Sequence, residues 1–267
     1  MFYGKLIAGT LGLLGMGIPG LVLGVFIGHT FDRGLGGVFK FTSPENLARI
    51  KASFFETTFL LLGHLAKADG RISTQEIEHT ERIIAQMGLS ADQRERAIKL
   101  FHSGAAADFE LAEAVSAFLE TCGSHKHLQQ TLLLFLISLA LSDHNLDTSE
   151  HAVLQRIAAL MGFGVAQLEQ LLRMAQAQGH FHHQAGSKLP PDTSIEDAYT
   201  ALGVDSGVSD KELKRAYRKL MSQNHPDKLI AQGVPENMIK VATEKAQDIQ
   251  AAYEMVRKHR GNESKAS

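Results

Sequence analysis

A run of 23 residues without a charged side chain, from Leu6 to Gly28, is the strongest constraint on the fold of this chain. As a helix rising about 1.5 Å per residue, the run is long enough to cross a hydrocarbon core about 30 Å thick. A cleaved signal peptide would have a shorter apolar region and a small-x-small cleavage site, and His29 to Asp32 offers none. The many glycines disfavour a buried soluble helix, because glycine is commoner in membrane spans. We predict a permanent transmembrane anchor within residues 1–32.

The positive charges beside this run predict its orientation. Only Lys5 precedes the run, whereas Arg33, Lys40, Arg49 and Lys51 follow it. Lysine and arginine are enriched on the cytoplasmic side of membrane spans. We therefore expect a short amino terminus outside the cytoplasm and the long carboxyl-terminal part inside it.

Three glycines recur at every fourth position near the end of the span: Gly20, Gly24 and Gly28. Small residues at this spacing let two membrane helices approach closely. The spacing predicts a homodimer formed through the span. The alternative is that glycine is simply common in this segment.

The rest of the sequence predicts an all-α fold. Alanine, leucine, glutamine and glutamate are abundant and tryptophan is absent. Ser43 and Pro44 have the residue types of a helix N-cap and first turn, and helical patterns continue to about Gln178. We expect one helical domain over residues 43–178. The single cysteine, Cys122, excludes an intrachain disulfide and fits a reducing compartment, more as a small buried residue than as a catalytic thiol.

An internal repeat lies in this helical part. The segment from Asp69 to Glu76 recurs 74 residues later as the segment from Asp143 to Glu150. Each copy has an Asp-marked turn followed by a capping box, Ser73 with Glu76 and Asp147 with Glu150. The repeat predicts a duplicated helical hairpin, and the pattern resembles TerB-like domains.

The acidic turns of the repeat leave a metal site open as a minority interpretation. Asp143, Asn145 and Asp147 resemble the start of a calcium loop, but Leu154 stands where an EF-hand needs a bidentate glutamate. The Asp69 copy has Arg71 at a ligand position, and arginine does not bind cations. A turn and helix cap is the preferred interpretation. The linker expected over residues 179–193 contains neighbouring histidines, for which a metal role is not favoured.

The segment from Asp210 to Lys228 predicts an amphipathic helix. One face carries Leu213, Ala216, Tyr217 and Leu220 at i, i+3, i+4 and i+7, and Ser209 with Glu212 forms a capping box. A second face is basic and carries Lys211, Lys214, Arg215 and Arg218, with Lys219 beside them. We expect Pro226 to end the helix and to leave His225, Pro226 and Asp227 exposed.

Three interpretations of the basic face are open. It could be a solvated surface, a nucleic-acid contact or a docking face for an acidic protein surface. Nucleic acid is disfavoured, because the formal net charge of the chain is −2.

Four motifs around this helix occur in the order found in the J domains of DnaJ-type co-chaperones. They are Tyr199-Thr-Ala-Leu-Gly-Val204, Ala216-Tyr-Arg218, His225-Pro226-Asp227 and Ile249-Gln-Ala-Ala-Tyr-Glu254. Residues 194–260 therefore resemble a J domain. The resemblance implies docking on a DnaK-type chaperone and stimulation of its ATP hydrolysis. It assigns DnaK binding to the His-Pro-Asp tripeptide and to Lys211, Lys214, Arg215, Arg218 and Lys219.

The order of anchor, TerB-like domain and J domain resembles the DjlA family of membrane-anchored co-chaperones. The resemblance implies a regulatory protein of the bacterial inner membrane, with a periplasmic amino terminus and a role in envelope-stress or capsule signalling. No catalytic constellation stands out, so we expect neither an enzyme nor a cofactor. Two alternatives remain open: a membrane-bound metal or stress sensor with the J domain as output, and a secreted protein with a cleaved signal.

Overall fold

The computed structural model describes residues 43–70, 80–81, 84–85, 87–122, 125–141, 146–181 and 194–266. The chain divides into two compact units, Met1–Asn46 and Leu47–Ser267. Every regular element in the described residues is helical, so the predicted all-α fold is confirmed. The predicted anchor with its three glycines and the first capping box, Ser73 with Glu76, lie outside the described residues. Within the described ranges, no helix is both long and apolar enough to cross a membrane.

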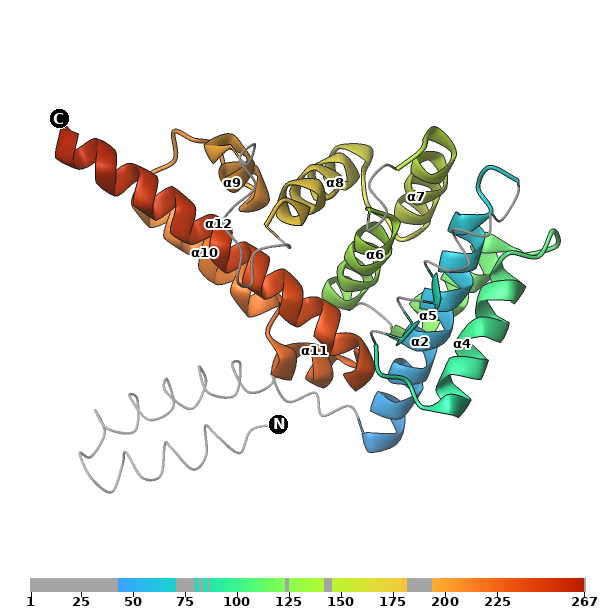
Figure 1. Ribbon diagram of the computed structural model, residues 1–267. Helices are drawn as coiled ribbons and strands as arrows, with labels where there is room; N and C mark the ends of the chain where they lie inside the picture. Colours follow the sequence, from blue (N-terminus) through green and yellow to red (C-terminus); the bar gives the residue numbers. More distant parts are fainter. Residues whose placement is uncertain are drawn as a thin grey trace, which may run out of the picture. The chain divides into compact units, whose positions relative to one another are not determined.

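The first part of the described chain is a bundle of helices (Figure 1). Its elements are α2 (Pro44–Ala66), α4 (Ala91–Gly104), α5 (Leu111–Cys122), α6 (Lys126–Ala140), α7 (Thr148–Leu160) and α8 (Val165–Gly179). Ser43 caps α2, because its hydroxyl accepts a hydrogen bond from the backbone N–H of Asn46 at 3.3 Å. This start of α2 agrees with the sequence prediction.

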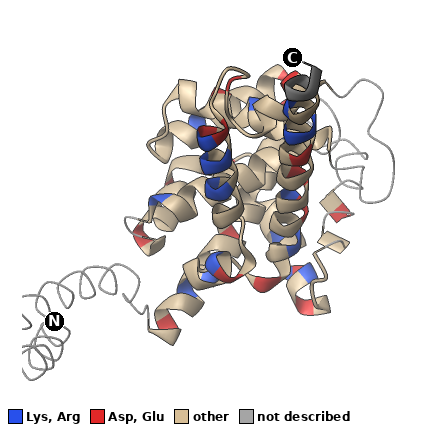
Figure 2. Ribbon diagram, turned by 90° about the vertical axis from the view of Figure 1, so that its left-hand side faces the viewer, with Lys and Arg blue, Asp and Glu red and all other residues tan. Residues whose placement is uncertain are grey.

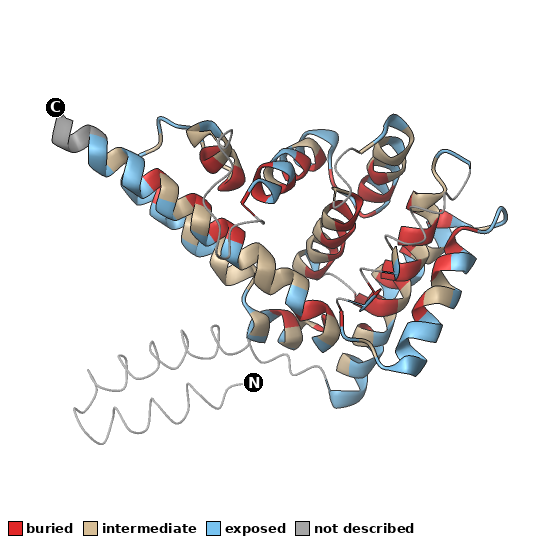
Figure 3. Cartoon of the chain, in the orientation of Figure 1, coloured by how far each residue is buried: buried red, intermediate tan, exposed pale blue. Residues whose placement is uncertain are grey.

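The core of the bundle is built on buried phenylalanines. Phe54 of α2 makes edge-to-face contacts with Phe118 of α5 and Phe135 of α6, with ring centroids 6.2 Å and 6.4 Å apart. Such tilted pairs are favourable because the positive edge of one ring meets the negative face of the other. Figure 3 shows the buried residues along the inner faces of these helices. The core therefore joins residues that lie far apart in the sequence.

Helices α2 and α4 cross at two glycines. A Cβ atom on Gly63 would lie 1.9 Å from the backbone oxygen of Phe101, and one on Gly104 would lie 1.8 Å from that of Leu60. Only glycine fits at either position, because the obstacle is backbone rather than a movable side chain. These two residues set the close approach of α2 and α4.

The 74-residue offset of the predicted repeat also relates Met87-Gly88 to Met161-Gly162, and the two pairs have similar structures. Met87 and Met161 are both buried, and the glycines that follow, Gly88 and Gly162, have φ angles of 64° and 76°. At the second copy, Asp147 caps α7 and Glu150 completes the capping box, as predicted. Both turns therefore use a glycine in the left-handed region to leave a helix.

The carboxyl-terminal part forms a second core around a helical hairpin. Its elements are α9 (Ile195–Ala201), α10 (Asp210–Gln223), α11 (Pro226–Gln232), a 3-10 turn η3 (Glu236–Met238) and α12 (Ile239–Ala266). Figure 1 shows α10 and α12 running side by side. Leu213 of α10 is buried with Ile249, Ala252 and Val256 of α12. Phe181, within the segment expected to be a linker, is also buried in this core.

The segment after α10 departs from the sequence prediction. Helix α10 ends at Gln223, just before the His-Pro pair, as expected, but Pro226 also occupies the first turn of a new helix, α11, which was not predicted. Proline suits this position because its missing N–H would have no helical partner there and its φ is already helical. Leu229 and Val234 then join the core of the helical bundle. Gly233 closes α11 with φ 101° in contact with Ile50 of α2.

Candidate functional site

The basic face of α10 is exposed to solvent. Lys211, Lys214, Arg215 and Arg218 follow one another at i, i+3, i+4 and i+7 and are all exposed. Figure 2 shows the blue bands of this helix beside α12, the helix that ends at the carboxyl terminus. The first turn of α10 is acidic, which suits the positive end of the helix dipole. Hydrogen bonds from Ser209 lower the pKa of Glu212.

The His-Pro-Asp tripeptide forms the start of α11. His225 is the N-cap, and its ring Nδ1 accepts a hydrogen bond from the backbone N–H of Asp227 at 3.2 Å. The side chains of His225 and Asp227 are 56% and 87% exposed. The tripeptide is therefore an accessible, capped helix start.

Lys219 lies at the edge of the basic face of α10, on the side that meets the helical bundle. Ala216, Lys219, Leu220 and Gln223 are spaced i, i+3, i+4 and i+7, and all four line a cavity against the helical bundle. The structure thus brings Lys211, Lys214, Arg215 and Arg218 together but sets Lys219 at the edge of their face. A helical wheel drawn from the sequence already separates Lys219 from the other basic residues. Only the structure shows that the side of α10 with Lys219 packs against the helical bundle.

Arg260 fixes the start of the basic helix, a role that the sequence analysis missed. Its guanidinium donates to Tyr199 Oη at 2.8 Å, to Asp210 Oδ1 at 2.7 Å and to the backbone oxygen of Ser206 at 3.0 Å. The planar, multidentate guanidinium suits this junction of three segments. It ties the end of α12 to α9 and to the first residue of α10. No sequence spacing signals this contact, because 50 residues separate Arg260 from Asp210.

Of the residues that suggested a metal site in the second repeat copy, the structure describes Asp147. Among the described residues no group of three potential ligands from histidine, cysteine, aspartate and glutamate occurs. The carboxylate of Asp147 accepts from the backbone N–H groups of Ser149 and Glu150, at 2.6 Å and 2.8 Å. It therefore serves as a helix cap, as preferred from the sequence. Asp143, Asn145 and Arg71 lie outside the described residues.

Three family profiles match successive parts of the chain. Residues 1–38 match the transmembrane domain of the co-chaperone DjlA, residues 56–174 match the tellurite resistance protein TerB, and residues 197–263 match the DnaJ domain. The exposed His-Pro-Asp helix start and its basic neighbour lie within the third match. The chain is thus a membrane-anchored co-chaperone with a J domain, and a J domain implies an Hsp70-type chaperone, DnaK, as partner.

Relatives match along nearly the full length of the chain. The co-chaperone protein DjlA of Shewanella oneidensis is 40% identical over 97% of this chain and 98% of its own length. The DjlA proteins of Photobacterium profundum and Coxiella burnetii are 37% and 38% identical, over 97% and 96% of this chain and 99% and 97% of their own lengths. The chain belongs to the DjlA family of co-chaperones, which are not enzymes. No solved structure matches it.

Proposed function

We propose that this protein docks on DnaK through α10 and the His225-Pro226-Asp227 helix start and thereby stimulates ATP hydrolysis by DnaK. The observation that carries the proposal is the junction of an exposed basic face with an accessible tripeptide that caps and starts α11. Lys211, Lys214, Arg215 and Arg218 supply the charge for an acidic partner surface. Lys219, at the edge of this face, is the weakest contributor.

The two parts of the site have different roles in the proposed mechanism. Complementary charge raises the rate of encounter between proteins and fixes their register, so the basic face serves for recognition. A ligand shifts a conformational equilibrium only as far as it binds one state better than the other. The tripeptide, as the proposed source of that difference, must therefore contact DnaK more favourably in the hydrolysing state.

The test is single-turnover ATP hydrolysis by DnaK with the full-length protein in detergent or lipid nanodiscs. His225→Gln removes the ring and is expected to abolish stimulation, while the circular dichroism of the protein stays unchanged. Stimulation by the His225→Gln protein equal to that by the wild type would overturn the role of the tripeptide.

Charge reversal tests the basic face separately. Lys214→Glu with Arg215→Glu is expected to slow association with DnaK by roughly 10-fold or more at low salt, because steering depends on ionic strength. Arg173→Glu changes an exposed charge on α8 and is the matched control. An equal effect of the control would show that only net charge matters.

We propose that the protein crosses the membrane once, with its amino terminus in the periplasm. The TerB-like domain (43–178), the linker (179–193) and the J domain (194–260) then lie in the cytoplasm. In that organisation a TerB-like domain and a linker precede the J domain. The J domain then lies in the cytoplasm, where DnaK and ATP are available. Protease digestion of sealed inner-membrane vesicles tests the orientation: in right-side-out vesicles the J domain must be protected.

We also propose that the protein forms a homodimer through Gly20, Gly24 and Gly28. Its proposed biological role is in envelope-stress or capsule signalling. Gly24→Leu would hold two spans apart and is expected to lower chemical crosslinking in membranes. Leu23→Ala, which keeps all three glycines, is the control. Unchanged crosslinking of the Gly24→Leu protein would argue against this interface.

A further inference from the structure

A cavity of about 310 Å³ lies between the helical bundle and the J domain. One wall is formed by α6 and α8 of the bundle, and the opposite wall by α10 and α12 of the J domain. This volume is at the lower end of the range of about 300–1,000 Å³ typical of small-molecule sites. The cavity is large enough for a small metabolite.

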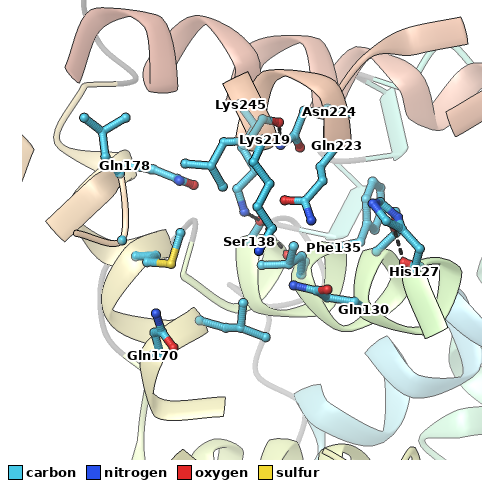
Figure 4. A pocket seen from close by; sticks show the side chains of 18 of the residues that line it. His127, Gln130, Phe135, Ser138, Gln170, Gln178, Lys219, Gln223, Asn224 and Lys245 are labelled. Carbon is cyan, nitrogen blue, oxygen red and sulfur yellow. Dashed lines mark hydrogen bonds between the residues drawn. The ribbon is translucent and has the colours of Figure 1, made fainter. Parts of the chain in front are cut away.

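Polar side chains converge on the cavity from both walls. Figure 4 shows Gln130 and Ser138 on α6 and Gln170 on α8, opposite Lys219 and Gln223 on α10. A carboxamide both donates and accepts hydrogen bonds, so these groups suit a polar ligand better than a hydrocarbon. Leu134, Leu171 and Leu220 supply apolar surface between them.

The charge of the cavity is positive. Lys219 and Lys245 both line it, and none of its described lining residues is acidic. Lys245 is partly buried and donates to the hydroxyl of Ser138, which accounts for one of the three N–H donors of its ammonium group. Asp248, the acidic residue that acts on Lys245, lies one turn further along α12 and does not line the cavity.

We propose that this cavity binds a small organic or inorganic anion, with its charged group between Lys219 and Lys245 and its remaining polar atoms on the carboxamides of Gln130, Gln170 and Gln223. Even partial burial of the Lys245 ammonium is costly, and an anion would supply both the opposite charge and hydrogen-bond acceptors. The chemical class is a carboxylate or phosphate compound small enough for the cavity. Lys219, at the edge of the proposed DnaK-docking face, is shared by the two sites.

An anion in this position would connect the two parts of the protein. Its partners come from the TerB-like helices on one side and from the J domain on the other, so binding stabilises their contact. The cavity lies on the face of α10 that carries Ala216, Lys219, Leu220 and Gln223, whereas Lys211, Lys214, Arg215 and Arg218 follow another face. Apart from Lys219, the anion and DnaK therefore contact different residues of α10.

The test is calorimetric titration of the full-length protein in a neutral detergent, at low chloride and pH 7, with inorganic phosphate and with citrate as probes. At least one of the two anions is expected to bind saturably with one site per chain. The probe that binds more tightly identifies the charged group. Absence of saturable binding of both probes at millimolar concentrations would overturn the proposal.

Three variants locate the binding. Lys245→Met and Lys219→Met are each expected to weaken it by at least 10-fold, and Lys219 is exposed, so its replacement leaves folding intact. Lys214→Met, on the docking face, is the matched control and is expected to bind like the wild type. Equal affinity of all four proteins, or loss only in the Lys214→Met protein, would place the anion elsewhere. No measurement involves DnaK, so the outcome is independent of the proposed function.

Discussion

The ring of Tyr217 on α10 lies flat against the ring of Tyr253 on α12, with centroids 4.0 Å apart and an interplanar angle of 9°. The guanidinium of Arg257 lies 5.9 Å from the centroid of Tyr253. The two tyrosines belong to separate sequence motifs, the Ala216-Tyr-Arg218 segment and the Ile249–Glu254 segment. Their stacking gives a physical reason for both motifs, because the pair fixes the basic helix against its antiparallel neighbour.

We predict a measurable coupling between these two rings. In a double-mutant cycle of Tyr217→Ala and Tyr253→Ala, the interaction free energy is expected to be about 1 kcal/mol, as for other aromatic pairs. The measurement is the free energy of local opening from hydrogen exchange of the α10 amides in the full-length protein. Tyr253→Phe retains the ring and is the control, expected to change the opening by less than about 0.5 kcal/mol. Additive effects of the two alanines would contradict the coupling.

The glycine crossing of α2 and α4 gives a second prediction. Gly63→Ala and Gly104→Ala are each expected to destabilise the helical bundle by about 3 kcal/mol or more, because the new methyl group meets backbone atoms that cannot turn aside. The measurement is the shift in thermal unfolding temperature. Gly179→Ala, which meets nothing within 4 Å, is the control and is expected to be nearly neutral. A tolerated alanine at Gly63 would show that the helices can separate without loss.

Cys122 gives a third prediction, on chemical reactivity. Burial raises the pKa of its thiol to about 12, from an ordinary value of 9.0. The thiolate is the reactive form, so three pKa units lower the alkylation rate about 1,000-fold at neutral pH, before steric protection. As the chain contains one cysteine, maleimide labelling followed by mass spectrometry reports this site alone. Labelling in urea is the control, and a native rate close to that in urea would contradict the burial.

Local sequence signals predicted the elements of the fold well. The capping boxes at Ser209 and Asp147 predicted the starts of α10 and α7. These features depend on residues within a few positions of one another, and sequence spacing records such relationships directly. Packing between distant segments cannot be predicted in this way, because it depends on which helix faces come into contact in the folded chain.

Pro226 illustrates the limit of the local argument. A proline both ends one helix and suits the first turn of the next, and the sequence analysis considered only the first effect. Tertiary packing explains why a helix forms after Pro226, because Leu229 and Val234 are buried in the core of the bundle. The cavity between α6 and α12 and the contacts of Arg260 also join distant segments. No spacing within one segment could have predicted them.

The fourth prediction concerns Lys245 and pH. Burial is the main cause that lowers its pKa, to about 8 from 10.5, while Asp248 acts in the opposite direction; Lys219 is the other charged lysine at the cavity. Below pH 8 both the folded and the unfolded chain hold the proton, so the full cost of the buried charge is present. Between about pH 8 and 10.5 the folded state gives up its proton while the unfolded chain keeps it, and stability therefore rises with pH.

Lys245→Met removes this cost, so the variant is expected to be more stable than the wild type by at most roughly 3 kcal/mol at pH 7. The stability difference should shrink as the pH rises towards 10. Thermal unfolding of both full-length proteins between pH 7 and 10, without added anion, gives the comparison. Cys122, whose raised pKa makes stability fall above pH 9, is common to both proteins and cancels in the difference. A difference that stays constant or widens over this range would show that Lys245 is not buried as a charged group, and would remove one of the two lysines from the anion site.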